Sequence, residues 1–384
     1  MAGQRSIFED VGSQAKAPPP PQGGMIDAGR RGRGPVRIWL CIIFALVAAM
    51  ILVGGLTRLS DAGLSITEWR PVTGAIPPTT DADWQAEFQK YQQSPQFQLM
   101  NSRMDLPAFK RIFWWEWGHR QLGRTIGLVW ALGFLFFWVT RRIPVGWARR
   151  ILGLGLLGGL QGAVGWWMVA SGLTGQMVSV ASYRLAVHLG IGFAILGLTG
   201  WFILSLSRPE SALLQARRQQ ERQLVALSTG LMHAVFLQVL LGALVAGIDA
   251  GRAFPTWPLM GESFFPADAF YVPGGGSLWR AFFENPGLVQ FMHRIMGYLV
   301  FAFGVVAVLK GRRSAHATTA GAFLAVGAML LLQVTLGILT VLHAAPLGLG
   351  IAHQTGAIVL FTLVLRARHR ALYPIVTSIR DQKR

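Results

Sequence analysis

Four histidines stand near one end of four apolar segments and form two matched pairs, His119 with His188 and His293 with His353. All four are predicted to lie in the first turns of membrane helices and at one depth. A metal-binding or ionisable side chain is costly to bury in a membrane, so its presence there indicates function. Two pairs at one depth predict two metal centres with two axial nitrogens each, the ligand set of a bis-histidine heme.

The histidines also share a pattern of following glycines. His119 and His293 each begin a His-Arg-x-x-Gly motif, and Gly192 stands four residues after His188. A glycine at this spacing lies on the histidine's own helix face and removes a side chain that would block a flat macrocycle. The alternative is ordinary glycine packing between membrane helices. The repeated context favours the heme interpretation.

The two halves differ at one position that could carry chemistry. Glu116 stands three residues before His119, whereas Gln290 stands three residues before His293. Residues at this spacing share a helix face, so Glu116 is predicted to point toward whatever His119 ligates. A carboxylate there could accept a proton or stabilise positive charge, which an amide cannot do. The first half is therefore predicted to do chemistry and the second to hold a permanent electron-transfer heme. The alternative is a salt bridge from Glu116 to Arg120.

Two arginines follow the histidines directly, and their role stays open between two interpretations. Arg120 and Arg294 could pair with heme propionates or could extend to the membrane surface as snorkelling side chains. The remaining histidines are not predicted to be ligands, because they lack a repeat partner or stand in loops or among basic residues: His233, His343, His316 and His369. Of these, His316 and His369 are predicted to be solvated.

The composition indicates the fold class in which these residues are placed. The chain has 384 residues, of which 52% are hydrophobic and only 14% charged, so it is too apolar for a soluble domain. A bilayer crossing needs about 20 mostly apolar residues. The long uncharged stretches predict an all-α integral membrane protein with eight transmembrane helices.

An internal duplication divides these helices. Leu52–Pro71 aligns without a gap to Leu240–Leu259, and Gln161-x-x-x-Gly165 returns as Gln333-x-x-x-Gly337. Two tandem four-helix bundles related by a pseudo-twofold axis are predicted. The predicted regions are a disordered cytoplasmic tail (1–35), an N-terminal bundle (36–207), a cytoplasmic linker (208–222), a C-terminal bundle (223–368) and a cytoplasmic tail (369–384).

The net charge of +18 indicates topology and not nucleic-acid binding. Lys and Arg gather in the N-terminal segment, in alternate connections and in the C-terminal segment, which all fall on one face of an eight-helix protein. By the positive-inside rule, both termini are predicted to be cytoplasmic. The single cysteine, Cys41, lies in the first crossing and excludes an intramolecular disulfide or a thiolate cluster. The first residues lack the short apolar core of a secretory signal.

Several motifs together resemble those of the heme A synthase family. They are the run Gly54-Gly55-Leu56-Thr57-Arg58-Leu59-Ser60-Asp61-Ala62-Gly63-Leu64-Ser65, then Glu68-Trp69, Pro71-Val72-Thr73-Gly74, Glu116-x-x-His119-Arg120, Met292-His293-Arg294 and Ala352-His353-Gln354. The resemblance covers roughly residues 36–368. Because the chain lacks cysteine pairs in its outer loops, it resembles the branch of proteobacteria and mitochondria.

The resemblance implies an oxidoreductase that converts heme O to heme A by oxidising the C8 methyl to a formyl group in two hydroxylations, for terminal oxidase assembly. It assigns His293 and His353 to a heme b cofactor, His119 and His188 to heme O, and catalysis to Glu116. The partners expected are heme O, a heme O synthase, an electron-donor protein, the lipid bilayer and a second copy of the chain. The expected location is the bacterial inner membrane, with the mitochondrial inner membrane as the weaker alternative. The competing function is a diheme b-type electron-transfer protein.

Overall fold

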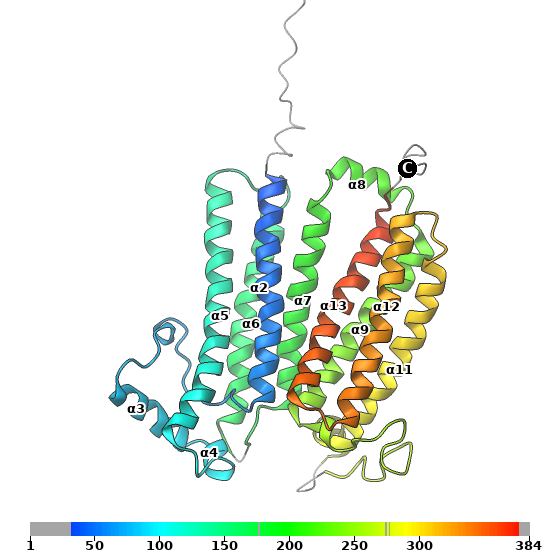
Figure 1. Cartoon of the computed structure of the whole chain (residues 1–384). Coiled ribbons are helices and arrows are strands. Elements are labelled where there is room, and N and C mark those ends of the chain that lie inside the picture. The colour runs from blue at the N-terminus through cyan, green and yellow to red at the C-terminus, as the bar shows by residue number, and fades with distance from the viewer. Residues whose placement is uncertain (1–31, 176, 273–274, 276, 376–384) are drawn as a thin grey trace, which may run out of the picture.

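The computed structural model describes residues 32–175, 177–272, 275 and 277–375, and within these ranges the regular structure is helical, with no strand. Eight of the helices are long and apolar enough to cross a membrane, which confirms the predicted fold class. They run side by side in Figure 1. These helices are α2 (Arg33–Leu59), α5 (Leu106–Val139), α6 (Ala148–Gly172), α7 (Ser182–Leu206), α9 (Arg222–Gly247), α11 (Pro286–Gly311), α12 (Ala317–Leu342) and α13 (Leu347–Leu372).

The connections contain shorter elements that were not predicted. Two short helices follow α2 at the lower end of Figure 1, and another joins the two halves at the opposite end. The last of these lies within the predicted linker 208–222. The short elements are α3 (Asp81–Gln92), α4 (Pro95–Leu99), α8 (Glu210–Arg217), α10 (Ala281–Glu284) and the 3-10 turns η1 (Thr73–Ala75), η2 (Ala250–Arg252) and η3 (Leu278–Arg280).

Two of the predicted boundaries differ from the structure. Helix α2 begins at Arg33, before the predicted start of the first bundle at 36, and α13 continues to Leu372, past the predicted end at 368. His369 therefore lies in a helix and is only 3% exposed, packed against Trp201 and Tyr373 with ring centroids 5.2 Å and 5.0 Å away. The prediction that His369 is solvated is wrong. It rested on the basic residues next to His369 in the sequence, whereas the His369 side chain lies on a buried face of α13. The predicted disorder of residues 1–31 lies outside the described residues.

The equivalent helices α5 and α11 begin in the same way. Asp105 accepts a hydrogen bond from the Ala108 amide (2.9 Å), and Asn285 accepts one from the Leu288 amide (2.8 Å). Both caps satisfy a backbone donor that the first helical turn leaves free. A proline in the first turn of each helix also favours a helix start there, because the N–H that proline lacks would have no partner within the helix.

The membrane helices pack as two closed groups of four. In the first half α2 contacts α5, α5 contacts α6, α6 contacts α7 and α7 returns to α2. In the second half α9, α11, α12 and α13 close in the same order. Between the halves, α7 contacts α9 and α13 contacts α2, which are the two equivalent pairings that a twofold relation would give. The pseudo-twofold axis itself remains an inference from this pairing.

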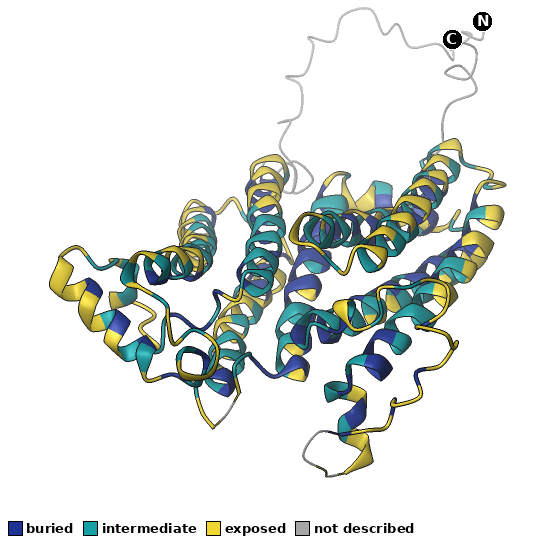
Figure 2. Ribbon diagram, turned by 60° about the horizontal axis from the view of Figure 1, so that its bottom comes forward, coloured by how far each residue is buried: buried dark blue, intermediate teal, exposed yellow. Residues whose placement is uncertain are grey.

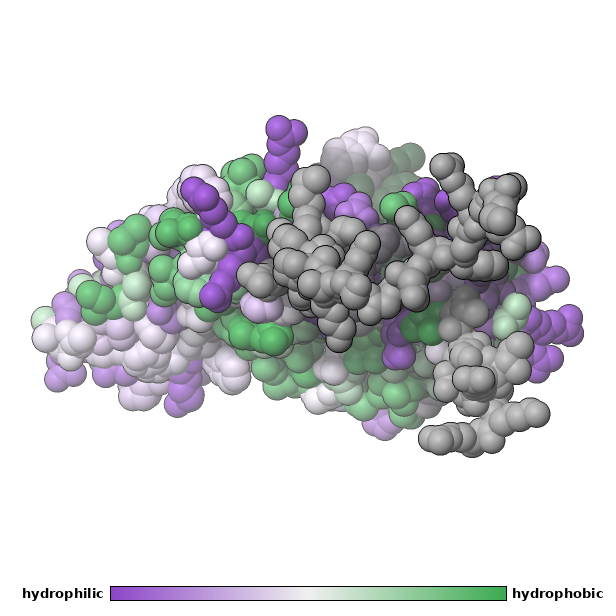
Figure 3. Space-filling model, turned by 90° about the horizontal axis from the view of Figure 1, so that it is seen from above, coloured by the Kyte–Doolittle hydropathy of each residue, from purple (hydrophilic) through white to green (hydrophobic). Residues whose placement is uncertain are grey.

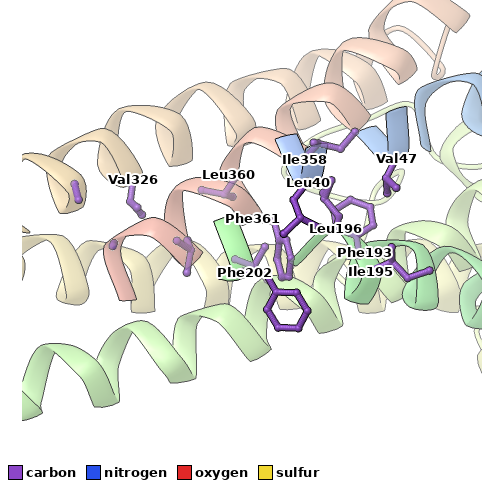
Figure 4. Packing of buried hydrophobic residues seen from close by; sticks show 14 of the residues in the cluster. Leu40, Val47, Phe193, Ile195, Leu196, Phe202, Val326, Ile358, Leu360 and Phe361 are labelled. Carbon is purple, nitrogen blue, oxygen red and sulfur yellow. The ribbon is translucent and has the colours of Figure 1, made fainter. Parts of the chain in front are cut away.

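The main apolar core lies where the two groups meet. Helix α7 is more deeply buried than any other membrane helix, and Phe193 and Leu196 on α7 pack with Phe361 on α13 in Figure 4. The outer helices α5 and α6 instead have few buried residues, and Figure 2 shows exposed and half-buried residues along the outward faces. Because lipid is as apolar as these side chains, such faces need no protein partner.

Polar contacts also join the halves. The Arg58 guanidinium on α2 forms ion pairs with Asp61 of its own half (3.0 Å) and with Asp249 of the other half (2.9 Å). The two aspartates are repeat equivalents, and both adopt a positive φ, 50° and 53°. Gln354 on α13 donates to the carbonyl of Ile51 on α2 (2.7 Å). These contacts hold α2 against the second half at the end of the molecule that carries the histidines.

Candidate functional site

The structure places the four histidines on four different helices of the two groups. His119 lies on α5, His188 on α7, His293 on α11 and His353 on α13. The last three stand within about 10 Å of their helix starts, since each residue rises about 1.5 Å. The prediction that all four lie in the first turns is wrong for His119.

Helix α5 is longer than a bilayer crossing requires, and this explains the difference. It contains 34 residues and begins at Leu106, about 20 Å before His119 at about 1.5 Å per residue. An aromatic cluster of Trp84, Phe88 and Tyr91 from the α3 region with Phe109 and Phe113 of α5 supports this extension. The segment that follows α2 packs against these extra turns. His119 lies beyond them, inside the group of membrane helices.

A glycine on a neighbouring helix faces each histidine ring. A Cβ atom placed on Gly54, Gly165, Gly242 or Gly337 would come within 3.0, 2.9, 3.1 or 3.1 Å of the Cε1 atom of His119, His188, His293 or His353 respectively. These distances are tighter than ordinary van der Waals contact. Each imidazole therefore occupies a notch that any larger residue would fill, and the notch repeats four times. This contact between glycine and ring was not predicted, because it joins residues on different helices.

The second histidine pair converges on a shared space. The ring centroids of His293 and His353 are 6.3 Å apart, with an interplanar angle of 79°. A metal bound between two imidazoles needs about 2 Å to each nitrogen, to which the distance from each nitrogen to its own ring centre must be added. The observed separation fits one iron between the two rings. In the first half, His119 and His188 lie on α5 and α7, the helices equivalent to α11 and α13.

The glycines that follow the histidines were predicted to leave room for a macrocycle. In the structure, side chains of neighbouring helices lie next to them. The amide nitrogens of Gln161 and Gln238 lie 3.6 Å and 3.3 Å from a Cβ placed on Gly192 and Gly297. These amides donate to the backbone carbonyls of His188 and His293, 3.0 Å away in both cases. The missing side chain therefore gives a neighbouring residue access to the histidine's backbone.

Glu116 is buried, with 2% exposure, and its carboxylate has several partners. It accepts hydrogen bonds from the Ser65 hydroxyl (2.8 Å) and the Ile66 amide (2.9 Å), both in the loop after α2. It also forms an ion pair with Arg120 at 2.7 Å. The salt bridge weighed as an alternative is therefore present. The hydrogen bonds of the carboxylate go to the loop and to Arg120, and none of those in the described residues goes to His119.

The two arginines next to the histidines anchor the outer loops. Arg120 donates to the carbonyls of Ile66 (2.8 Å) and Glu68 (3.0 Å), and Arg294 donates to those of Phe254 (2.8 Å) and Leu259 (3.1 Å). Their guanidinium groups are thus turned into protein and do not extend freely to the surface, so snorkelling does not describe them. The Nε atom of Arg294 is buried without a partner in the described residues. A propionate contact for either arginine stays a prediction.

Gln290 holds the second-half loop as Glu116 holds the first. Its amide nitrogen lies within hydrogen-bond reach of the carbonyls of Gly251 (3.4 Å) and Phe254 (3.3 Å), and its buried Oε1 atom has no partner among the described residues. The amide donates to its loop, whereas the carboxylate of Glu116 accepts from its loop. Both positions are therefore loop anchors, and only the first carries a negative charge.

The remaining histidines do not join the pairs. The Nδ1 atoms of His233 and His343 lie 2.8 Å from carbonyls of their own helices, at Thr229 and Leu339. His316 is the residue that precedes α12. In the described part of the chain, no three His, Cys, Asp or Glu side chains come together as a metal site. The candidate centres therefore consist of histidine pairs.

Comparison with known proteins places this arrangement in a family. Residues 37–365 match the COX15-CtaA family, described as cytochrome oxidase assembly protein, and this range contains both histidine pairs and Glu116. The chain belongs to this family. The similarity of the chain to individual relatives extends over almost its full length.

Three relatives, each named heme A synthase, illustrate that similarity. The protein of Paracoccus denitrificans (strain Pd 1222) is 60% identical over 99% of this chain and 100% of its own length. The protein of Ruegeria sp. (strain TM1040) is 60% identical over 98% of this chain and 99% of its own. The protein of Cereibacter sphaeroides (strain ATCC 17029) is 61% identical over 98% of each. The family resemblance predicted from the motifs is confirmed.

Proposed function

We propose that this protein is a heme A synthase, which oxidises the C8 methyl group of heme O to a formyl group. Two hydroxylations convert the methyl first to a hydroxymethyl group and then to a geminal diol, which loses water to give the aldehyde. The observation that carries the proposal is a repeated histidine pair in which only one half has a buried carboxylate, Glu116 in place of Gln290. The names of the relatives support the same reaction.

The second half is the proposed site of the resident cofactor, heme b. His293 and His353 would supply its two axial nitrogens, because their rings are separated by the span of one iron. The glycine notches at Gly242 and Gly337 fix both rings against neighbouring helices. When bound, heme b supplies a one-electron redox centre. Arg294, with a free buried Nε atom, is the proposed propionate contact in this half.

The first half is the proposed site of the substrate. His119 and His188 would bind the iron of heme O, with Arg120 near its propionates. A site between membrane helices suits the long apolar tail of heme O. Glu116 would hold or move a proton at its carboxylate during oxidation of the methyl group. Arg120 forms an ion pair with this carboxylate at 2.7 Å and balances its charge in the buried environment.

The proposed location is the bacterial inner membrane, with both termini in the cytoplasm. The proposed partners are a heme O synthase, an electron-donor protein and a second copy of the chain. Figure 3 looks onto the end of the molecule where α2 begins and α8 lies, and hydrophilic side chains are exposed there. Arg217 and Arg222 beside α8 belong to the basic connections of this end. These residues would face the cytoplasm under the positive-inside rule.

Cysteine labelling tests this orientation. Cys41 is the only cysteine and is replaced by serine first. In right-side-out vesicles, an impermeant maleimide should label single cysteines at the exposed positions Gln89 and Gln98, in the segment between α2 and α5. It should not label a cysteine at Gln215 on α8 until the membrane is permeabilised. Labelling of Gln215→Cys alone in intact vesicles would reverse the topology.

Pigment extraction tests the function itself. The chain is expressed in a host that makes heme O but no heme A, and hemes are extracted and separated. Heme A is expected in the extract with this chain and absent with the empty vector. A diheme electron-transfer protein would leave heme O unchanged while adding only heme b to the membranes. That result would contradict the proposal.

A further inference from the structure

Three of the four histidines are held by a glutamine on the neighbouring helix. Gln161, Gln238 and Gln333 each stand four residues before the glycine that faces the ring. Each amide nitrogen donates to the backbone carbonyl of its histidine at 3.0 Å. Each also lies near a ring nitrogen of that histidine, at 3.4, 3.1 and 3.3 Å respectively. The glutamine therefore contacts both the backbone and the ring of a candidate ligand.

The carbonyl oxygens of these amides are available for a further bond. The Oε1 atoms of Gln161, Gln238 and Gln333 are buried and have no partner among the described residues. A metal-bound imidazole carries a proton on its other nitrogen and usually donates it to a nearby acceptor. The amide nitrogen already donates to the backbone carbonyl of its histidine, so the unpartnered Oε1 atom is the group of each glutamine left to accept that proton. This contact would orient the ring and strengthen the nitrogen as a ligand.

The fourth position of this repeat is a methionine. Met50 stands four residues before Gly54, which faces the His119 ring. Its Cε atom lies 3.3 Å from a Cβ placed on Gly123, the same separation that the Gln238 amide nitrogen has from Gly297. Met50 therefore occupies the place of the glutamine.

The exchange removes the hydrogen bond. A thioether donates no proton and accepts only weakly. In the described residues neither nitrogen of the His119 ring has a hydrogen-bond partner. The Nδ1 atom of His188 is also buried without a partner, but the Gln161 amide lies 3.4 Å from its Nε2 atom. His119 is therefore the one candidate ligand that no amide holds.

We propose that Met50 makes His119 the releasable ligand of the substrate heme, an inference that rests on the proposed function. A resident heme is held by two oriented ligands, whereas a substrate must enter and its product must leave. Gln161 holds His188 as the fixed side of the substrate site, and Met50 leaves the opposite side weaker. The second half has a glutamine at both positions, which suits a heme that stays. Met50 and the three glutamines are thus positioning residues for heme exchange.

The test measures heme release without turnover. The purified full chain is loaded with ferric heme O in the absence of reductant, and transfer of heme to excess apomyoglobin is followed by absorbance. Loss of a partner in contact with a metal ligand typically changes metal affinity by about 10-fold to 100-fold. Met50→Gln should slow release of heme O by about that factor and raise its low-spin fraction. Met50→Leu, which fills the space without an amide, should release heme O at the rate of the unmodified protein.

The second half provides the matched control. Gln238→Met creates the same exchange at the heme b site and should speed release of heme b by about 10-fold to 100-fold. If Met50→Gln does not accumulate, Gln161→Met replaces it and should speed release of heme O. The proposal is overturned if Met50→Gln behaves as Met50→Leu, or if Gln238→Met retains heme b as before. The release measurement needs no turnover. A failure of this proposal can therefore be told apart from a failure of the proposed function, which is measured by heme A formation.

Discussion

Replacing Glu116 by glutamine should stop heme A formation while leaving the fold and heme b in place. Loss of a positioned proton-transfer group typically slows a reaction by about 10²–10⁴-fold. Cells carrying Glu116→Gln should therefore accumulate heme O or the hydroxymethyl intermediate, measured by extraction and separation of hemes. The amide is close in volume to the carboxylate, and the second half already accommodates a glutamine at the equivalent position 290.

The structure supplies the controls for this variant, because Glu116 also anchors the loop after α2. Ser65→Ala removes one hydrogen bond to the carboxylate and keeps its charge. It should weaken the loop anchor by about 1.5–3 kcal/mol, the range for a hydrogen bond to a charged group. Heme A formation should fall less than in Glu116→Gln, because the carboxylate is kept. Gln290→Glu should leave product formation close to normal. A normal rate of heme A formation in Glu116→Gln would contradict a catalytic role and leave Glu116 only as an anchor of the loop.

Replacing His293 or His353 should deplete bound heme b, because each is expected to supply one of its two axial nitrogens. Either alanine variant should lose the low-spin, six-coordinate heme b spectrum, and the double variant should purify with little heme b. Without that redox centre, heme A formation should also fall to a small fraction of normal. Reduced-minus-oxidised spectra and heme extraction of the purified protein measure both effects.

Two further variants separate this result from general damage. His119→Ala should retain heme b and weaken the binding of heme O, the opposite of the effect expected for His293→Ala. His233→Ala should change neither, because this ring bonds to the Thr229 carbonyl of its own helix. A normal six-coordinate heme b spectrum in the double variant His293→Ala/His353→Ala would remove the assignment of the second half.

The membrane helices and the repeat could be predicted from the sequence, because each depends on local composition. In a bilayer, an apolar stretch of this length must hydrogen-bond its own backbone polar groups, which a helix does. The eight crossings therefore follow from hydropathy. The convergence of His293 and His353 agrees with the duplication, and the pairing of His119 with His188 stays a prediction. What the pattern predicts less well is where a helix ends outside the membrane, as the extension of α5 and the burial of His369 show.

The side-chain contacts could not be predicted, since they join residues distant in sequence. Glu116 was expected to face the iron site because it shares a helix face with His119. Its hydrogen bonds to Ser65 and Ile66 depend instead on how the loop after α2 folds back against α5. Likewise, the glycine four residues after three of the histidines suggested room for a macrocycle. Only the packing of neighbouring helices shows that Met50 or a glutamine such as Gln238 lies there. Helix periodicity identifies a face but not its occupant.

The measurement that tests the proposed function most directly is the fate of heme O on the purified protein. The protein, carrying heme b in its second half, is supplied with heme O, an electron-exchange partner and oxygen, and hemes are extracted over time and identified by mass. Heme O should decrease as the hydroxymethyl form and then heme A appear, while the amount of heme b stays constant. Recovery of heme O unchanged from a protein that binds both hemes would contradict a synthase and favour a diheme electron-transfer protein.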